Sequence, residues 1–405
     1  GAIVPIACAT RNITTSERAG RLAALIYTLS PLSYALSRYW YPDHYLAFFS
    51  ALVLWSISTQ PPARGRGRIV KIGIAWGLAL SVKYTALLLG LPIAIVLWTV
   101  NFFRGPNNSS SISNWYLRAK SLALVGIVAL ATFVALNPGV FLRTSQFLEG
   151  WKYNINNYSQ ASNGLLGIRF YVEQLGVYLF GFIALPVAVI GVIRIRRLMP
   201  HLAVACVAFP LLICVYFGMS SYAINRNVSL TVPFLVVLIA AGADGLIHKS
   251  QSVPLPRVAM AAVVLAVFAL PSSETTSAVL HDFRKDSRLL ARDWLDKNLP
   301  VDASVGSNEF CSGPPPLTRN DLTVSMGPNM DQELDYYVFN SYWDSPLTRA
   351  YRTIREQKYF HFYKFNRLDL GPWWNGTPNI ARFIPSNYEI VKIFASNGPD
   401  VVVLQ

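Results

Sequence analysis

Residues 69–100 read IVKIGIAWGLALSVKYTALLLGLPIAIVLWTV. This apolar run is about 32 residues long, whereas a single membrane span takes about 20 residues. Lys83 stands in its middle, and a lysine has no favourable place in hydrocarbon. The run therefore predicts two short helices joined by a tight turn at Lys83 and Tyr84, with the ammonium group at the membrane surface or paired with an anion.

Apolar runs fill most of the first two thirds of the chain. Hydrophobic residues make up 53% of the 405 residues and charged residues 14%, against about 25% charged in soluble domains. This composition excludes a disordered chain and an ordinary cytosolic enzyme. The other predicted spans are 22–37, 42–58, 119–136, 170–193, 202–218, 228–247 and 257–271, and residues 1–10 resemble the end of one more. We predict an all-α polytopic membrane domain over 1–271, with about nine complete helices and a partial one.

The net charge of +14 indicates how the chain is oriented in the membrane. Residues 1–270 contain 21 Lys and Arg but five Asp and Glu, whereas 271–405 contain 14 and 16. The bases of the first part cluster at 11–21, 64–71, 104–120, 194–197 and 249–257. All five clusters fall on one side when the predicted crossings are counted, and the positive-inside rule makes that side cytoplasmic. We therefore predict a multi-pass protein of the plasma (inner) membrane that binds membrane lipids and no nucleic acid.

Residues 272–405 form the second predicted domain, which the same count places outside the cytoplasm. Helical spacing covers 284–298, and strand-like stretches cover 303–306, 388–395 and 400–404. We predict a smaller α/β domain, with no order of elements proposed for 308–385.

Polar side chains gather where the predicted spans reach the outer surface. Asp43 follows Pro42 at the start of a span, Arg38 precedes it and His44 follows it. A carboxylate suits the first turn of a helix and an interfacial arginine can snorkel, so a structural role stays open. The alternative is a carboxylate and a guanidinium that face a polar cavity.

The same two interpretations apply to Lys83 and Arg226. Each is either an interfacial anchor or a ligand for phosphate, which arginine binds through its planar fork and lysine as a point charge. The loop 137–169 begins with Asn137 and contains Tyr153 within an aromatic belt. It predicts an interfacial amphipathic helix at 143–158 or a wall over a lipid-head or sugar pocket.

These motifs, taken in order, resemble the GT-C glycosyltransferase superfamily, and most closely its group of protein mannosyltransferases and bacterial aminoarabinose transferases. The matching residues are Ser30-Pro31, Arg38, Pro42-Asp43, Phe48-Phe49, GLALSVKYT at 77–85, Asn137-Pro138, and Arg226 with Pro233. Residues 294–300 and 399–404 resemble segments of the outer domain of that group. The resemblance runs over nearly the whole chain.

The resemblance implies transfer of a sugar, with inversion, from a polyprenyl-phosphate carrier to a lipid, glycan or protein acceptor. Asp43 would be the catalytic carboxylate, and Lys83 and Arg226 would bind the donor phosphate. The substrate-binding residues would be Arg38, His44, Tyr84, Asn137 and Tyr153. No cofactor is implied with certainty. Some GT-C enzymes use a divalent metal, although no carboxylate cluster here demands one.

The principal catalytic acid of the family lies in its first outer loop, for which this sequence has no matching residue. Asp43 matches the second acid of the outer face. We therefore expect either that this polypeptide is inactive alone or that the sequence omits an N-terminal segment.

Two other classes of function remain open from the sequence. A transporter or flippase would show internal repeats and charges at mid-membrane, neither of which is visible here. A non-catalytic membrane scaffold would explain the missing acid.

Overall fold

The computed structural model describes most of the membrane domain and parts of the second domain. The described residues are 1–30, 33, 42–59, 66–99, 111–159, 164–173, 175, 180, 183–219, 225–250, 287–307, 323–326, 335–340, 390–394 and 401–404. The chain divides into two units, Gly1–Thr275 and Thr276–Gln405. The predicted span 257–271 and Arg38 lie outside the described residues, and so does the side chain of Arg226.

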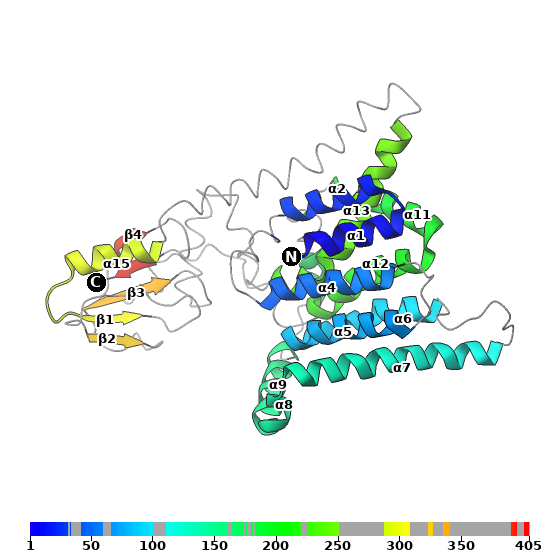
Figure 1. The fold of residues 1–405 in the computed structure, drawn as a ribbon. Coiled ribbons are helices and arrows are strands. Elements are labelled where there is room, and N and C mark those ends of the chain that lie inside the picture. The colour runs from blue at the N-terminus through cyan, green and yellow to red at the C-terminus, as the bar shows by residue number, and fades with distance from the viewer. Residues whose placement is uncertain are drawn as a thin grey trace. The chain divides into compact units, whose positions relative to one another are not determined.

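The first unit is built from helices that pack side by side (Figure 1). In chain order they are α1 (Ile3–Thr14), α2 (Glu17–Leu29), α4 (Pro42–Ser58), α5 (Arg66–Val82), the 3-10 helix η1 (Tyr84–Leu89), α6 (Gly90–Thr99), α7 (Ser111–Leu136), α8 (Gly139–Leu142), α9 (Thr144–Ser159), α10 (Gly164–Glu173), α11 (Ala184–Leu198), α12 (Pro200–Gly218), the 3-10 helix η3 (Asn225–Thr231) and α13 (Val232–Ser250). Helix α1 packs on α2 and α4, α4 on α5, and α5 on α7.

Among the described residues, three helical stretches are long and apolar enough to cross a membrane. They are Trp115–Leu136, Pro200–Gly218 and Asn227–His248, and the shorter stretch Tyr84–Thr99 is apolar as well. Ile127 and Leu130 on α7 are each more than 60% exposed, as expected for a helix that faces lipid.

The predicted span 170–193 is wrong as a single helix. Helix α10 ends at Glu173 and α11 begins at Ala184. Pro186 stands in the first turn of α11, where its missing N–H breaks no intrahelical hydrogen bond. The proline was the sequence signal for a new helix start, and the uninterrupted hydropathy concealed it.

Glycines allow two pairs of helices to approach very closely. A Cβ atom added to Gly77 would lie 2.5 Å from the carbonyl oxygen of Ala129, so α5 and α7 meet at their backbones. Gly191 on α11 and Gly242 on α13 approach the backbone of the opposite helix in the same way. Helix association in membranes depends on such small residues because lipid supplies no hydrophobic drive between helices.

Arg68 belongs to one of the predicted cytoplasmic basic clusters and closes the end of α4. Its Nη2 donates to the carbonyl of Ile57 at 2.6 Å and its Nε to that of Ser56 at 3.3 Å. A cation is favourable at the carboxyl end of a helix.

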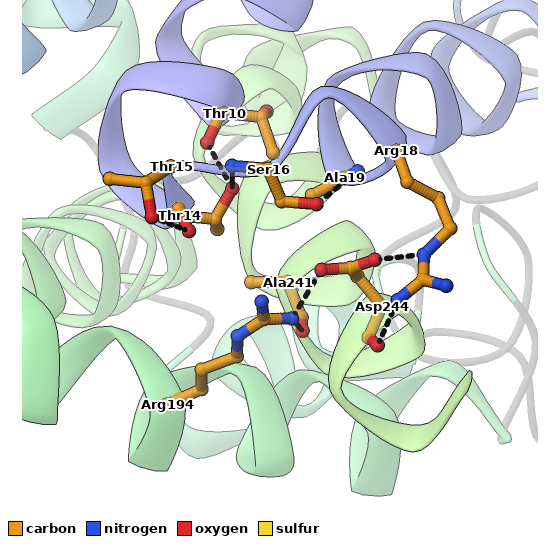
Figure 2. Close-up of polar contacts among 9 residues, drawn as sticks. All are labelled: Thr10, Thr14, Thr15, Ser16, Arg18, Ala19, Arg194, Ala241 and Asp244. Atoms are coloured by element: carbon orange, nitrogen blue, oxygen red, sulfur yellow. Dashed lines mark hydrogen bonds and ion pairs between the residues drawn. The ribbon is translucent and has the colours of Figure 1, made fainter. Parts of the chain in front are cut away.

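Asp244 on α13 joins three helices through two other bases of the predicted cytoplasmic clusters (Figure 2). Arg18 on α2 donates its Nε to one carboxylate oxygen of Asp244. Arg194 on α11 approaches the other oxygen at 2.6 Å, and its Nη1 also donates to the carbonyl of Ala241 at 3.0 Å. The Asp244 side chain is only 1% exposed, so this is a buried, charge-paired contact. We call Arg18, Asp244 and Arg194 the arginine clamp.

The second unit contains helix α15 (Ser287–Asn298) and strands β1 (Ser304–Ser307), β2 (Thr323–Met326), β3 (Tyr336–Asn340), β4 (Ile390–Phe394) and β5 (Val401–Leu404). The strands form one sheet in the order β2-β1-β3-β5-β4. Strand β1 runs parallel to β2 and β3, and β5 runs antiparallel to β3 and β4. Ala291 and Leu295 of α15 pack with Val305 and Val338 of the sheet in a small core.

Candidate functional site

The turn predicted at Lys83 is present. Helix α5 ends at Val82, and η1 begins at Tyr84. Lys83 itself is extended, with φ −159° and ψ 133°, so a single residue reverses the path of the chain. Its N–H still bonds to the carbonyl of Ala79, and its own carbonyl accepts from the N–H of Ala86.

Trp76 braces this turn from inside α5. Its indole Nε1 donates to the carbonyl oxygen of Ala86 at 2.9 Å. The ring leaves so little room beyond it that a Cβ atom on Gly90 would lie 3.1 Å from Trp76. The indole therefore fixes the geometry from which the Lys83 side chain projects.

Lys83 forms an ion pair with Asp43. The distance from Nζ to Oδ1 is 2.9 Å, and the side chains are 19% and 4% exposed, respectively. Asp43 lies in the first turn of α4, directly after Pro42, where the helix dipole favours a carboxylate. The sequence left two places open for Lys83, the membrane surface or a pair with an anion, and did not identify Asp43 as the partner.

The ion pair lines a cavity of about 810 Å³. Tyr84, Ser81 and Asn137 contribute further polar groups. Most of the remaining lining is apolar: Leu80, Val82, Phe133, Leu136, Pro138, Val140 and Phe147. The site therefore combines a charged corner with an apolar wall, which suits a ligand with a polar head and a hydrocarbon tail.

Much of the apolar wall comes from the end of α7 and from the segment that follows it. This segment consists of α8, Arg143 and α9, and we call it the α8–α9 elbow. Asn137 ends α7, with its Nδ2 bonded to the carbonyl of Phe133 at 2.8 Å. Phe147 lines the cavity and lies 6.5 Å, ring to ring, from Trp151, which is 46% exposed. The amphipathic helix predicted at 143–158 is thus present as α9, and it also supplies part of the cavity wall.

The predicted site residues divide into three groups. Asp43, Lys83, Tyr84 and Asn137 come together at the cavity. His44 and Tyr153 are not among its described lining residues. The Nδ1 of His44 is buried and has no hydrogen-bond partner among the described residues, and Tyr153 is 67% exposed on α9. Arg226 lies in η3, but its side chain is outside the described part of the chain, as is all of Arg38.

The sequence missed a set of buried polar residues in η3. Asn227, Ser229 and Thr231 are at most 2% exposed. Ser50 on α4 donates to the carbonyl of Leu230 at 2.7 Å, and Asn227 donates to the hydroxyl of Tyr171 at 3.2 Å. Short polar side chains beside an apolar run gave no sign of burial, although they share η3 with Arg226.

Metal ligands do not cluster within the described ranges. No group of three or more His, Cys, Asp or Glu residues that could hold a metal ion occurs there. The described lining of the cavity supplies one carboxylate, that of Asp43. These described residues do not fit a metal ion.

Comparison with known proteins supports the resemblance inferred from the sequence. The sequence model of the dolichyl-phosphate-mannose-protein mannosyltransferase family matches residues 2–138. This region contains Asp43, Lys83, Tyr84 and Asn137. No curated protein matches the chain. The apolar helices are those of a multi-pass membrane protein, and residues 2–138 resemble the dolichyl-phosphate-mannose-protein mannosyltransferase family.

Two solved structures are similar to this chain at low sequence identity. The archaeal oligosaccharyltransferase AglB from Archaeoglobus fulgidus, in complex with an inhibitory peptide and a dolichol-phosphate, is 15% identical with a TM-score of 0.41. That similarity covers 74% of this chain and 46% of AglB, so the chain spans less than half of that protein. ArnT from Cupriavidus metallidurans in the apo state is 13% identical with a TM-score of 0.49, covering 99% of this chain and 82% of ArnT.

Proposed function

We propose that the protein is an integral-membrane glycosyltransferase that moves a sugar from a polyprenyl-phosphate carrier to an acceptor outside the cytoplasm. The observation that carries the proposal is the Lys83–Asp43 pair at the charged corner of an otherwise largely apolar cavity. Both residues lie in the region that matches the mannosyltransferase family.

The reaction breaks the bond between the anomeric carbon and a phosphate oxygen, and the bonding electrons remain on the phosphate. A fixed cation stabilises that developing charge, most strongly in a site partly shielded from water. Lys83 is placed for this role, with Arg226 as a second donor-phosphate ligand. The acceptor hydroxyl attacks from the opposite face of the sugar, which inverts the anomeric centre.

The carboxylate of Asp43 would orient the incoming hydroxyl and accept its proton. It is nearly buried, and it points to the same cavity as Lys83. Tyr84 and Asn137 offer hydrogen bonds to sugar hydroxyls in that cavity, with Arg38, His44 and Tyr153 as further substrate-binding candidates.

The apolar wall would hold the first part of the prenyl chain. Phe147 faces the cavity, while Trp151 and Phe141 of the elbow are exposed. Aromatic side chains favour the boundary between hydrocarbon and water. The elbow would therefore lie at the outer interface, beside the route by which a lipid-linked donor enters from the bilayer.

The basic clusters support the side of the membrane that we propose for the cavity. Arg68, Arg18 and Arg194 belong to the clusters that the positive-inside rule places in the cytoplasm, and the Lys83 turn lies at the other end of α5 from Arg68. We propose that the second unit is the extracytoplasmic α/β domain, which would help to bind a lipid, glycan or protein acceptor.

The test is transfer of a labelled sugar from a polyprenyl-phosphate donor by the full protein in liposomes. Lys83→Ala should lower the transfer rate by about 10²- to 10³-fold, as expected for loss of one preorganised donor. Lys71→Ala, an exposed lysine near the other end of the same helix, is the matched control. Equal rates in the two variants would refute the role of Lys83. Solute flux without sugar transfer would favour a transporter instead.

A further inference from the structure

We infer that Asp43 and the donor phosphate compete for Lys83, so that donor binding releases Asp43 for the acceptor. This inference rests on the proposed function and concerns the order of events at the same site. It makes the ion pair the resting state of the site.

The geometry of the pair gives the phosphate access to the lysine first. Lys83 is 19% exposed and Asp43 is 4% exposed, so the ammonium is the more open partner at the cavity. The backbone of Lys83 is fixed by the hydrogen bond between Trp76 and Ala86. Its four-carbon side chain and three donors can still change partners without moving that backbone.

The charges at the cavity favour a phosphate that replaces Asp43 as the partner of Lys83 over one that binds while the ion pair stays intact. Among the described lining residues, Lys83 is the basic side chain and Asp43 the acidic one, so their charges cancel. An arriving phosphate adds at least one negative charge close to Asp43, in surroundings that screen charges less than water does. Lys83 is the described cation of the cavity lining, so the phosphate and Asp43 compete for it, and its more exposed side is the one that the ligand can contact.

The exchange changes what Asp43 can do. While Oδ1 accepts a hydrogen bond from Nζ, that oxygen is less available to a hydroxyl of the acceptor. Once Lys83 turns to the phosphate, Oδ1 can accept from the hydroxyl instead. The donor would therefore bind before the acceptor, and the carboxylate would engage the hydroxyl only when a donor is present.

A double-mutant cycle on ligand binding tests this without any need for turnover. The probe is farnesyl phosphate, a short prenyl monophosphate, and binding is measured on the full chain in nanodiscs. Asp43→Asn should tighten binding about tenfold when Lys83 is present, because the competitor is gone. In the Lys83→Ala background the same change should tighten binding by no more than about threefold, since only repulsion is removed.

The outcomes separate this inference from the proposed function. Equal gains from Asp43→Asn in both backgrounds, or no gain with Lys83 present, would overturn the exchange. Equal binding of farnesyl phosphate by the unmodified protein and by Lys83→Ala would instead overturn the proposed function. Farnesol, which has no phosphate, should bind Asp43→Asn no more tightly than it binds the unmodified protein. Inorganic phosphate should bind Asp43→Asn more tightly if the headgroup alone drives the exchange.

A second comparison covers the case in which Lys83→Ala does not fold. Asp43→Glu keeps the negative charge that competes for Lys83, so it serves as the charge-matched comparison. Asp43→Asn should bind about tenfold more tightly than Asp43→Glu. If the two variants bind equally, the exchange does not occur.

Discussion

The indole Nε1 of Trp76 donates a hydrogen bond of 2.9 Å to the carbonyl oxygen of Ala86, across the turn that carries Lys83. Trp76→Phe removes this hydrogen bond and keeps most of the ring. We expect a loss of about 1 kcal/mol in stability and about a fivefold fall in sugar transfer, because Lys83 loses its fixed origin. Trp98→Phe, at a 42% exposed position on α6, is the control for the unfolding midpoint and the transfer rate. Identical behaviour of the two variants would show that the brace does not position Lys83.

The close approach of α5 and α7 should make Gly77 intolerant of any side chain. A Cβ atom there would lie 2.5 Å from the carbonyl oxygen of Ala129 and 2.5 Å from Cβ of Thr132. Gly77→Ala should lower the free energy of unfolding by about 1–3 kcal/mol, measured by thermal unfolding in detergent. Gly126→Ala is the matched control on α7, since nothing lies within 4 Å of its added Cβ. That variant should be neutral or more stable by up to about 1 kcal/mol. A stable Gly77→Ala protein would contradict the packing of this seam.

The arginine clamp should stabilise the first unit more than an exposed ion pair does. Asp244→Ala removes the buried carboxylate that Arg18 and Arg194 share. Because the two arginines are 39% and 26% exposed and can regain water, about 2–3 kcal/mol of stability should be lost. Glu17→Ala breaks an exposed pair with Arg11, whose side chains are 68% and 49% exposed, and should cost less than about 1 kcal/mol. Thermal unfolding of both variants in the same detergent compares the two losses. Equal losses would mean that the clamp does not stabilise the protein.

Asp335 should make the start of β1 sensitive to acid. The backbone N–H and the hydroxyl of Ser304 donate to Asp335 at 2.8 and 2.7 Å, and these hydrogen bonds hold the pKa of that carboxyl below its ordinary value of 3.8. Because the folded state binds the proton less readily than the unfolded state, this stabilisation is present above about pH 3.8 and is lost as the pH falls through the lower, folded pKa.

Hydrogen exchange of the β1 amides, corrected for the intrinsic rate at each pH, measures this effect. Protection should be steady from neutral pH to about pH 4 and should then fall. Asp335→Asn should lower protection at neutral pH and remove the acid dependence. Asp302→Asn, at a left-handed backbone position that asparagine also tolerates, is the control. An unchanged pH profile in Asp335→Asn would refute the assignment.

The sequence predicted those local features in which length and charge left few alternatives. The run 69–100 was too long for one membrane span and had a lysine at its centre, so a turn at Lys83 was the simplest prediction. The aromatic and polar spacing of 143–158 likewise predicted α9. Among the site residues, four of those proposed from the sequence line one cavity.

Contacts between helices that are far apart in the sequence could not be predicted from length, charge and hydropathy. The ion pair joins residues 40 positions apart, and phosphate was an equally acceptable partner for Lys83. Arg18 and Asp244 are 226 positions apart, and the positive-inside rule already accounted for the arginine as a topology signal. Which bases pair with which acid depends on helix packing, and apolar helices of similar composition do not encode their neighbours in hydropathy alone.

The arginine clamp also separates the helices that it joins from the helix that lines the cavity. It ties α2, α11 and α13 together at Asp244, which lies about 20 Å along α13 from η3. Helix α7, which leads into the elbow and lines one side of the cavity, packs mainly on α5 and α6 and takes no part in the clamp. Substitutions on α7 can therefore reshape the cavity while the clamped helices keep their arrangement. Under the proposed function, variation in this one helix would change the prenyl chain that the cavity accepts and would leave α2, α11 and α13 in place.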